Sequence, residues 1–329
     1  HFQYDHVKQG KRQVGSTFKP FVYATAIMNL GMTPCSTVSN ATYTKGDWVV
    51  EGKGGNLTLR DALAHSKNPV AVRLIESVSP KKVIQLARDL GVTEEMPNEY
   101  AIALGSTDIT IYEMLGAYSS FANFGNYIKP EMVWRIEDAN GRVIKEVKNE
   151  TKEVMNEMYA YTMIDLMKGV TRFGTASGEL RRMGIPETVE IAGKTGTTQN
   201  NSDGWFMGIT PNLATGVWVG WEDRATHFWS TGEGQGAKMA LPIWGIFMKK
   251  VWADKELGIT PDDKFAKPSN WTGDCADLQG LGGYGDDGGL QTIDQIKNPK
   301  PKDNQPKNNK PKEENLNENL NKDEVDFNQ

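Results

Sequence analysis

The spacing of apolar residues changes from helical to strand-like late in this chain, and this change is the strongest constraint on its fold. Up to residue 170, apolar residues recur mostly at the spacing of amphipathic helices. Three strand-like segments then follow one another, at residues 189–197, 204–210 and 214–221. Consecutive strands joined by a tight turn such as Pro211-Asn212 pair antiparallel. With a last helix predicted at 239–252, we expect an α+β fold, an αβ-sandwich in which helices flank an antiparallel sheet.

The earlier helices are predicted from their caps as well as from their spacing. Thr58 can cap a helix that has Asp61 at its third position and runs to residue 65. Asn68 stands before Pro69, which predicts an N-cap followed by proline at the first helical position. Further helices are predicted at 15–30, 79–91, 110–124 and 155–170, and a hairpin at 132–147 around the turn Asn140-Gly141.

The composition changes beyond Gly258, where Asp, Gly and Asn become frequent. From residue 296 onward almost nothing is apolar, and seven lysines balance seven acidic residues. Such a segment cannot bury enough surface to offset its chain entropy, so we expect it to be disordered. We therefore divide the chain into a folded domain at 1–258, a Gly/Asp-rich linker at 259–295 and a disordered tail at 296–329. The net charge of −5 then lies outside the tail, and it argues against a nucleic-acid partner.

Cysteine and histidine give no sign of a metal site. Cys35 and Cys275 are far apart and have no partners at metal-ligand spacing, and the four histidines are scattered. We expect no disulfide framework, no metal and no cofactor. The chain begins at His1 without an initiator methionine, a signal peptide or an apolar membrane-spanning run. We expect either that it was cut from a larger protein or that its gene is incomplete, and its residues do not reveal a compartment.

Ser16 and Lys19 stand three residues apart where an apolar helical run begins. This spacing places both side chains on one face of a helix, one turn apart. A serine hydroxyl becomes a good nucleophile when a base takes its proton, which a lysine of lowered pKa can do. Pro20 suits the first helical turn, so the helix is expected to begin at Gly15-Ser16, where its positive end favours a developing oxyanion. Ser-x-x-Lys by itself is common and carries little weight.

Two further motifs are weak when taken singly. Ser66-Lys67-Asn68 could relay a proton and hold a carbonyl group, but taken alone it is more often a helix cap followed by proline. Lys194-Thr195-Gly196-Thr197 lies on a predicted strand. Its lysine and hydroxyls suit a carboxylate, and its glycine lets a substrate backbone approach closely. The alternative is an ordinary edge strand with a solvated lysine.

The order of the three motifs is typical of the penicillin-recognising serine enzymes. The wider sequence resembles the transpeptidase domain of class A bifunctional penicillin-binding proteins over roughly residues 1–255. The matching segments are Lys11-Arg12-Gln13-Val14-Gly15-Ser16-Thr17-Phe18-Lys19-Pro20, Phe173-Gly174-Thr175-Ala176-Ser177, Lys194-Thr195-Gly196-Thr197-Thr198-Gln199, Asp203-Gly204-Trp205-Phe206, Thr231-Gly232 and Ala240-Leu241-Pro242-Ile243-Trp244.

The resemblance implies a role for each motif. Ser16 would attack the carbonyl between the two terminal D-alanines of a peptidoglycan stem peptide, with Lys19 as general base and Ser66 passing the proton to the leaving amine. The backbone N–H groups of Ser16 and Thr197 would form the oxyanion hole. An amino group of a neighbouring stem would then take the acyl group and cross-link the cell wall. The residues implied to bind substrate are Asn68, Lys194, Thr195, Gly196 and Thr197.

The resemblance also implies partners and surroundings. Stem peptides would be donor and acceptor, and β-lactam antibiotics would acylate the enzyme. The site would act on the extracytoplasmic face of the bacterial membrane, with a glycosyltransferase domain and a membrane anchor upstream. Strands that normally precede the nucleophile helix are absent, so the sheet of this chain is expected to lack its first strands.

Two alternatives stay open at this point. A hydrolase of the same superfamily, a D,D-carboxypeptidase or β-lactamase, would use water as acceptor. The class A β-lactamases need a glutamate–asparagine pair for that, and no convincing Glu-x-x-Leu-Asn occurs here. A non-catalytic penicillin-binding sensor would tolerate loss of Lys19 or Ser66, and this chain has both.

Overall fold

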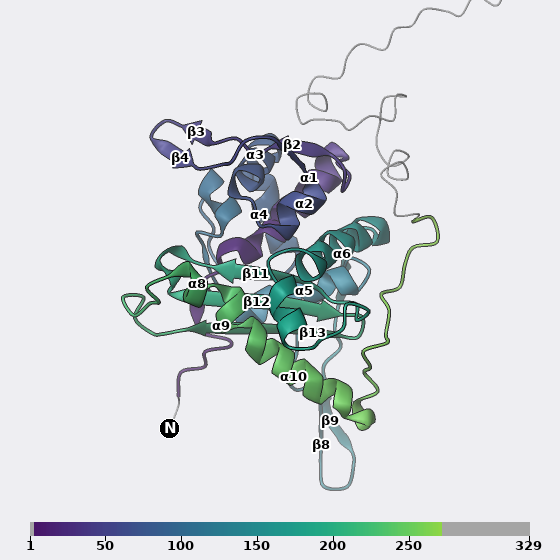
Figure 1. Ribbon diagram of the computed structural model, residues 1–329. Coiled ribbons are helices and arrows are strands. Elements are labelled where there is room, and N and C mark those ends of the chain that lie inside the picture. The colour runs from purple at the N-terminus through teal and green to yellow at the C-terminus, as the bar shows by residue number, and fades with distance from the viewer. Residues whose placement is uncertain (1–2, 272–329) are drawn as a thin grey trace, which may run out of the picture.

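The structure is a computed structural model and describes residues 3–271. A three-stranded antiparallel sheet lies at its centre, in the order β11 (Ala192–Thr197), β12 (Asp203–Thr210) and β13 (Leu213–Gly220). Every residue of β12 is buried, because this strand is paired on both sides and covered on both faces. Figure 1 shows helices above and below the sheet. The predicted α+β class is confirmed.

Alternation along β12 divides the core between the two faces of the sheet. On one face, the ring of Phe206 packs edge-on against that of Trp244 in α10 (Leu241–Ala253), with 5.1 Å between the ring centroids. On the other face, Met207 and Ile111 both lie within 3.4 Å of the position that a Cβ of Gly216 would take. Ile111 begins α5 (Ile111–Ala122), so α5 and α10 enclose the sheet from opposite sides.

The remaining large helices pack above the sheet as drawn in Figure 1. Phe21 joins the first of them to α5, because its ring contacts those of Tyr118 and Phe121, with centroid distances of 5.8 and 6.4 Å. The predicted cap at Thr58 is confirmed, since its hydroxyl accepts the N–H of Asp61 at 3.1 Å. These helices are α1 (Lys19–Leu30), α2 (Leu59–Ala64), α3 (Asn68–Val78), α4 (Pro80–Asp89) and α6 (Glu157–Arg172).

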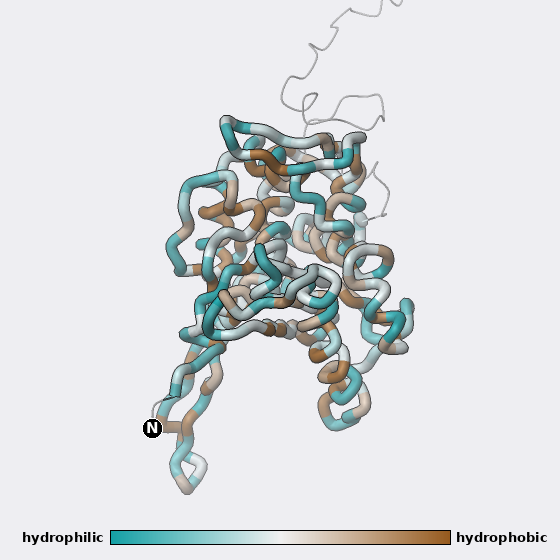
Figure 2. Tube along the Cα trace, turned by 60° about the vertical axis from the view of Figure 1, so that its left-hand side comes forward, coloured by the Kyte–Doolittle hydropathy of each residue, from teal (hydrophilic) through white to brown (hydrophobic). Residues whose placement is uncertain are grey.

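Short elements surround this body. The predicted hairpin around Asn140-Gly141 is confirmed as β8 (Arg135–Glu137) and β9 (Val143–Glu146), and it projects away from the body in Figures 1 and 2. The other ladders pair β1 (Lys11–Gln13) with β6 (Asp108–Thr110), β2 (Thr37–Ser39) with β5 (Asn56–Thr58), β3 (Tyr43–Lys45) with β4 (Trp48–Val50), and β7 (Asn126–Ile128) with β10 (Thr151–Glu153). Short helices are η1 (Gly15–Phe18), η2 (Tyr100–Leu104), α7 (Ser177–Arg182), η3 (Gln199–Asn201), α8 (Thr231–Gly234), α9 (Gly236–Met239) and η4 (Lys255–Leu257).

Two details differ from the sequence-based predictions. Asn68 is the first residue of α3 and Lys67 is its N-cap, so the predicted capping role of Asn68 is wrong. Cys35 is disulfide-bonded, although the wide separation of the two cysteines argued against a disulfide. Spacing along the chain cannot exclude such a bond, because only the folded path decides which sulfur atoms meet.

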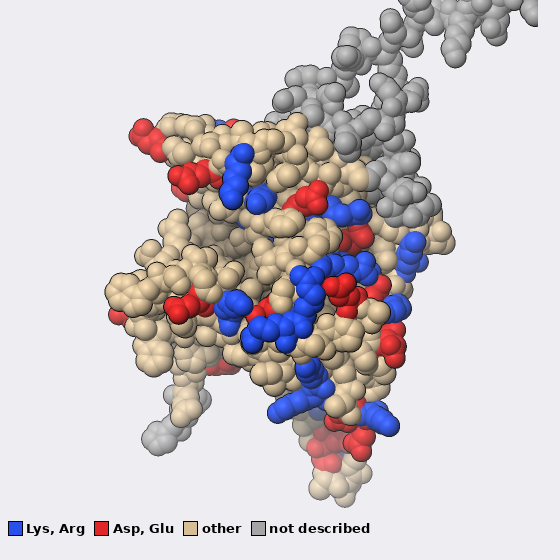
Figure 3. All heavy atoms as spheres, in the orientation of Figure 1, with Lys and Arg blue, Asp and Glu red and all other residues tan. Residues whose placement is uncertain are grey.

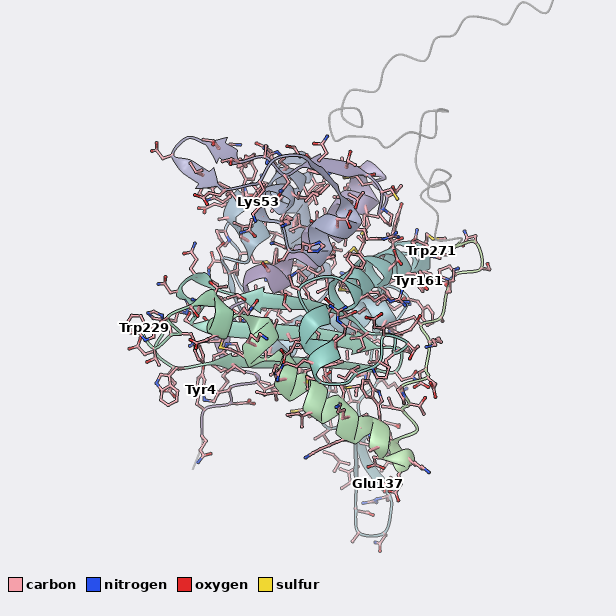
Figure 4. The ribbon with its side chains drawn as sticks, viewed as in Figure 1. Tyr4, Lys53, Glu137, Tyr161, Trp229 and Trp271 are labelled. Carbon is pink, nitrogen blue, oxygen red and sulfur yellow. The ribbon has the colours of Figure 1, made fainter. Side chains whose placement is uncertain are left out.

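Beyond α10 and η4, residues 259–271 form a strap that runs along the helices. Phe265 and Trp271 lie beyond the predicted boundary at residue 258, and each is 7% exposed. Trp271 packs on Tyr161 of α6 with 5.1 Å between ring centroids (Figure 4), and Lys264 donates to the carbonyl of Thr188 at 2.8 Å. The predicted disordered tail and most of the predicted linker lie outside the described residues. Within residues 3–271, no helix is long and apolar enough to cross a membrane.

Candidate active site

Ser16 lies in a tight turn that connects β1 to α1. The predicted helix start at Gly15-Ser16 is confirmed, with the difference that the first turn, η1, is a 3-10 helix. Gly15 adopts φ +53°, a conformation that favours glycine, and its N–H donates to the carbonyl of Gly105 at 3.1 Å. A Cβ on Gly15 would lie 2.8 Å from the carbonyl oxygen of Thr197. The turn that carries Ser16 therefore lies directly against the end of β11.

Lys19 and Lys194 converge on the hydroxyl of Ser66. The Nζ atom of Lys19 lies 3.1 Å from Ser66 Oγ, and that of Lys194 lies 3.0 Å from the same atom. Lys19 also donates to the Ser66 carbonyl at 2.6 Å and to Asn68 Oδ1 at 2.7 Å, while Lys194 donates to the carbonyl of Thr195 at 3.0 Å. Residues from all three motifs therefore meet at one point, as the sequence predicts.

Both lysine side chains are fully buried, and this sets their proton affinity. Burial, together with the positive charges of Lys194 and Lys67, lowers the pKa of Lys19 well below its usual value. Burial also lowers the pKa of Lys194 to about 7. No carboxylate contacts either ammonium group among the described residues. A neutral lysine is therefore accessible at this site near neutral pH, which a general base requires.

The backbone N–H of Lys19 donates to the Ser16 carbonyl, but the side chains of Ser16 and Lys19 are not hydrogen-bonded to each other. In the described part of the chain, the Lys19 ammonium donates to Ser66 and Asn68 only. Positions three residues apart lie above one another in a 3-10 turn, so the two side chains leave the same side of the backbone. Hydrogen bonds at unliganded catalytic sites often form only when substrate is bound.

The backbone at Ser66 is held in an uncommon conformation. Its φ of +54° is left-handed, which is rare for serine and persists only where the surroundings enforce it. The N–H of Ser66 donates to the carbonyl of Leu63 at 3.0 Å, and that of Lys67 donates to Ala62 at 2.9 Å. This turn between α2 and α3 directs the Ser66 hydroxyl toward the two lysines.

Strand β11 presents Lys194, Thr195, Gly196 and Thr197 along one edge of the site. A Cβ on Gly196 would lie 2.8 Å from the methyl group of Thr17, so glycine is needed for the strand to pack on the turn of Ser16. The Thr197 hydroxyl accepts the N–H of Gly236 at 3.1 Å. The surface is hollowed between the helices above and the sheet below in Figure 3.

Two residues that support this edge were not assigned a role from the sequence. The hydroxyl of Thr175 is hydrogen-bonded to that of Thr195 at 2.7 Å. The hydroxyl of Tyr118 donates to the carbonyl of Thr17 at 2.6 Å and holds the turn of Ser16. A role for Thr175 could have been inferred from the sequence, because residues 173–177 are one of the segments that resemble the penicillin-binding family. The only sequence signal at Tyr118 is its helical spacing.

The described residues contain no group of three or more His, Cys, Asp or Glu side chains that could hold a metal ion. The chemistry available at the site is that of a hydroxyl nucleophile, buried amines and backbone N–H groups. Such a set suits acyl transfer through a serine.

Comparison with known proteins agrees with this geometry. Residues 4–223 match the family model described as the penicillin-binding protein transpeptidase domain. The chain is 35% identical over 275 residues to penicillin-binding protein 1A of Aquifex aeolicus, an alignment that covers 79% of this chain and 36% of that protein. It is 34% identical over 271 residues to penicillin-binding protein 1A of Neisseria meningitidis, covering 77% and 33%. The chain therefore spans about a third of the length of these relatives.

Solved structures give the same result. Penicillin-binding protein 1A from Haemophilus influenzae superposes with a TM-score of 0.69 and 25% identity, over 81% of this chain and 45% of that one. The PonA1 protein from Mycobacterium tuberculosis, solved in complex with penicillin V, superposes with a TM-score of 0.68 and 25% identity, over 81% and 74%. The matched segment covers β1 to β13 and includes every residue predicted for the site. The chain belongs to the penicillin-binding protein transpeptidase domain family.

Proposed function

We propose that this chain is a peptidoglycan D,D-transpeptidase domain that works through a serine acyl-enzyme. The observation that carries the proposal is the convergence of two fully buried lysines on the Ser66 hydroxyl, next to the turn that presents Ser16. Burial favours the neutral form of a lysine, and a neutral amine beside a serine can accept its proton. The penicillin V complex of the PonA1 structure supports a site that also accepts β-lactams.

In the first half-reaction, Ser16 Oγ forms a bond to the carbonyl carbon between the two terminal D-alanines. Lys19 takes the hydroxyl proton. The tetrahedral intermediate collapses by breaking the bond to the leaving D-alanine nitrogen, to which the Ser66 hydroxyl passes a proton supplied by Lys19. The distance of 3.1 Å between Lys19 Nζ and Ser66 Oγ supports this relay.

Substrate is held by the edge of β11 and the start of α3. Lys194, Thr195 and Thr197 bind the terminal carboxylate, and Gly196 allows the substrate backbone to lie against the strand. Asn68 holds the substrate amide. The N–H groups of Ser16 and Thr197 receive the oxyanion, and each such donor contributes about 3–4 kcal/mol to transition-state stabilisation. The close approach of Gly15 to the Thr197 carbonyl supports this pairing, because it places the two donors on adjoining backbone segments.

In the second half-reaction, an amino group of a neighbouring stem attacks the acyl carbon and releases Ser16, which forms the cross-link. A D,D-carboxypeptidase or β-lactamase reaction, with water in place of the amine, is the alternative outcome. A β-lactam resembles the D-alanyl-D-alanine end and leaves a slowly hydrolysed acyl-enzyme. A sensor without turnover would bind penicillin but release no product.

The proposal extends to the protein as a whole. We assign residues 1–258 to the transpeptidase domain, 259–295 to a linker whose first part, residues 259–271, packs on the domain, and 296–329 to a tail. We place the site on the extracytoplasmic face of the bacterial membrane, in a class A protein that also carries a glycosyltransferase domain and a membrane anchor. The support is similarity to penicillin-binding proteins 1A, of which the chain spans about a third.

Labelling with a fluorescent penicillin tests the nucleophile. The parent chain is expected to label at Ser16, and Ser16→Ala is expected to lose the label. Equal labelling of the two proteins would overturn the assignment. Product analysis with a stem pentapeptide and an added acceptor amine then separates transpeptidase from carboxypeptidase, and absence of any released D-alanine from a protein that labels would indicate a sensor.

A further inference from the structure

The carboxylate of Asp203 is the centre of a buried hydrogen-bond network beside the site. Its side chain is 0% exposed. Oδ1 accepts from Arg12 Nε and from Trp218 Nε1, both at 2.9 Å. Oδ2 accepts from Ser202 Oγ at 2.8 Å and from Thr198 Oγ1 at 3.0 Å. Four donors on a fully enclosed carboxylate form a rigid group, because a buried charge is tolerated only when its hydrogen bonds are satisfied.

These donors come from the two segments that carry the proposed oxyanion hole. Arg12 lies on β1, four residues before Ser16, and β1 leads directly into the turn of Ser16. Thr198 directly follows Thr197. The backbone N–H of Thr198 donates to the Asp203 carbonyl at 3.1 Å, and the N–H of Asp203 returns to Thr198 Oγ1 at 3.0 Å. The Asp203 carboxylate therefore connects the strand that precedes Ser16 to the residue that follows Thr197.

The link on the side of Arg12 is also well fixed. Its guanidinium group lies over the ring of Trp218 at 4.7 Å and donates to the backbone carbonyls of Trp221 and, at 3.1 Å, Glu222. Its side chain is 13% exposed. Burial opposes ionisation of Asp203, but hydrogen bonds from Trp218, Ser202 and Arg12 outweigh it and hold the pKa of Asp203 below its ordinary value. The ion pair is thus formed at neutral pH.

We propose that Asp203 is a positioning residue that sets the separation of the Ser16 and Thr197 N–H groups through Arg12 on one side and Thr198 on the other. The inference rests on the proposed function, because the oxyanion hole is part of it. A shift of either donor by a fraction of an ångström weakens both half-reactions equally, since acylation and deacylation each pass through a tetrahedral oxyanion.

The test is the kinetics of fluorescent penicillin with the full chain, measured over a range of concentrations so that binding and acylation are separated. For Asp203→Asn we expect the acylation and deacylation rate constants, each expressed per site that labels, to fall in parallel by about tenfold. The affinity for penicillin before acylation is expected to change by less than about twofold, because the proposed contact of Lys194 with the carboxylate is not altered. Arg12→Gln cuts the same link from the other side and is expected to give the same loss.

Two control variants define the contrast. Trp218→Phe removes one donor to Asp203 but leaves the path from Arg12 to Thr198 intact, so its rate constants are expected to stay near those of the parent. Asp165→Asn removes a carboxylate from another Arg–Asp ion pair, partly exposed and 2.7 Å from Arg60, and is expected to leave the rate constants unchanged.

The outcomes separate the possible roles of Asp203. If Asp203→Asn or Arg12→Gln lowers only the fraction of molecules that label, with unchanged rate constants in those that do, Asp203 is a structural anchor and the proposal is wrong. The proposal is also wrong if Trp218→Phe slows the reaction as much as Arg12→Gln. Failure of the parent to label at Ser16 would instead overturn the proposed function, and the positioning role with it.

Discussion

The ammonium groups of Lys19 and Lys194 lie on either side of one hydroxyl, 3.1 and 3.0 Å from Ser66 Oγ. Two buried amines in contact with one hydroxyl cannot both remain charged without a large desolvation penalty. Proton sharing at this point is therefore expected to control both the reaction and part of the pH dependence of stability.

Replacing Lys19 with methionine is expected to abolish most acylation. The substitution keeps the volume of the buried side chain but removes the amine that we propose accepts the Ser16 proton, and a general base contributes about 10²- to 10⁴-fold. The measurement is the second-order rate constant for fluorescent penicillin. Lys45→Met, at a half-exposed lysine paired with Glu76, is the matched control and should react like the parent. A rate for Lys19→Met within tenfold of the parent would contradict the role of Lys19.

The rate of acylation is expected to fall as the pH rises through about 7. Lys194, whose pKa is about 7, loses above this pH the charge that we propose binds the carboxylate. Stopped-flow labelling from pH 5 to pH 9 measures the profile. A rate that is flat across this range would show that Lys194 does not titrate in the reaction.

Stability should also depend on Lys194 in a defined direction. The folded pKa of about 7 lies below the ordinary value of 10.5, so above pH 7 the unfolded chain binds more protons than the folded one. Stability therefore rises with pH between these values, by at most about 1.4 kcal/mol per pH unit, and the destabilisation is fully present below pH 7. Urea unfolding at pH 7 and pH 9 is the measurement. Lys194→Met should show a smaller increase than the parent, and an equal increase would contradict the buried-lysine explanation.

Gly15→Ala is expected to impair the site without unfolding the protein. The residue has φ +53°, and its new Cβ would lie 2.8 Å from the Thr197 carbonyl oxygen, so the turn of Ser16 must move away from β11. We expect a loss of about 1–3 kcal/mol in stability and at least a tenfold slower acylation. Gly178→Ala is the control, because this helical glycine has open space around its Cβ position. Normal acylation by Gly15→Ala would show that the contact does not set the geometry.

The strap at 259–271 is expected to stabilise the domain without taking part in the reaction. Phe265 and Trp271 are buried, and truncation of such side chains to alanine costs about 3–5 kcal/mol in well-packed cores. Phe265→Ala and a chain ending at residue 258 should therefore melt at lower temperature, yet label normally well below that temperature. Leu257→Ala, at a side chain 53% exposed, should leave the melting temperature within about 2 °C. If the chain ending at 258 melts like the parent, the domain ends where the composition changes.

The sequence alone determined the order of the elements and pointed to the residues that meet in the candidate site. Helix spacing, the Thr58 cap and the strand run at 189–221 are local signals, because they act within a few residues of one another and do not depend on the path of the rest of the chain. The motif order predicted that Ser66 and Lys194 would meet Lys19, and the structure brings them within hydrogen-bond distance.

Only the tertiary structure decided which groups became partners. The Lys19 ammonium donates to Ser66 and Asn68 and not to the hydroxyl of its neighbour Ser16, and Asn68 is the first residue of its helix and not the cap. Arg12 meets Asp203 across 191 residues of chain. These choices follow from burial: once a polar group is enclosed it must find a hydrogen-bond partner among whatever groups the folded chain places nearby, and the spacing of residues along the sequence does not contain that information.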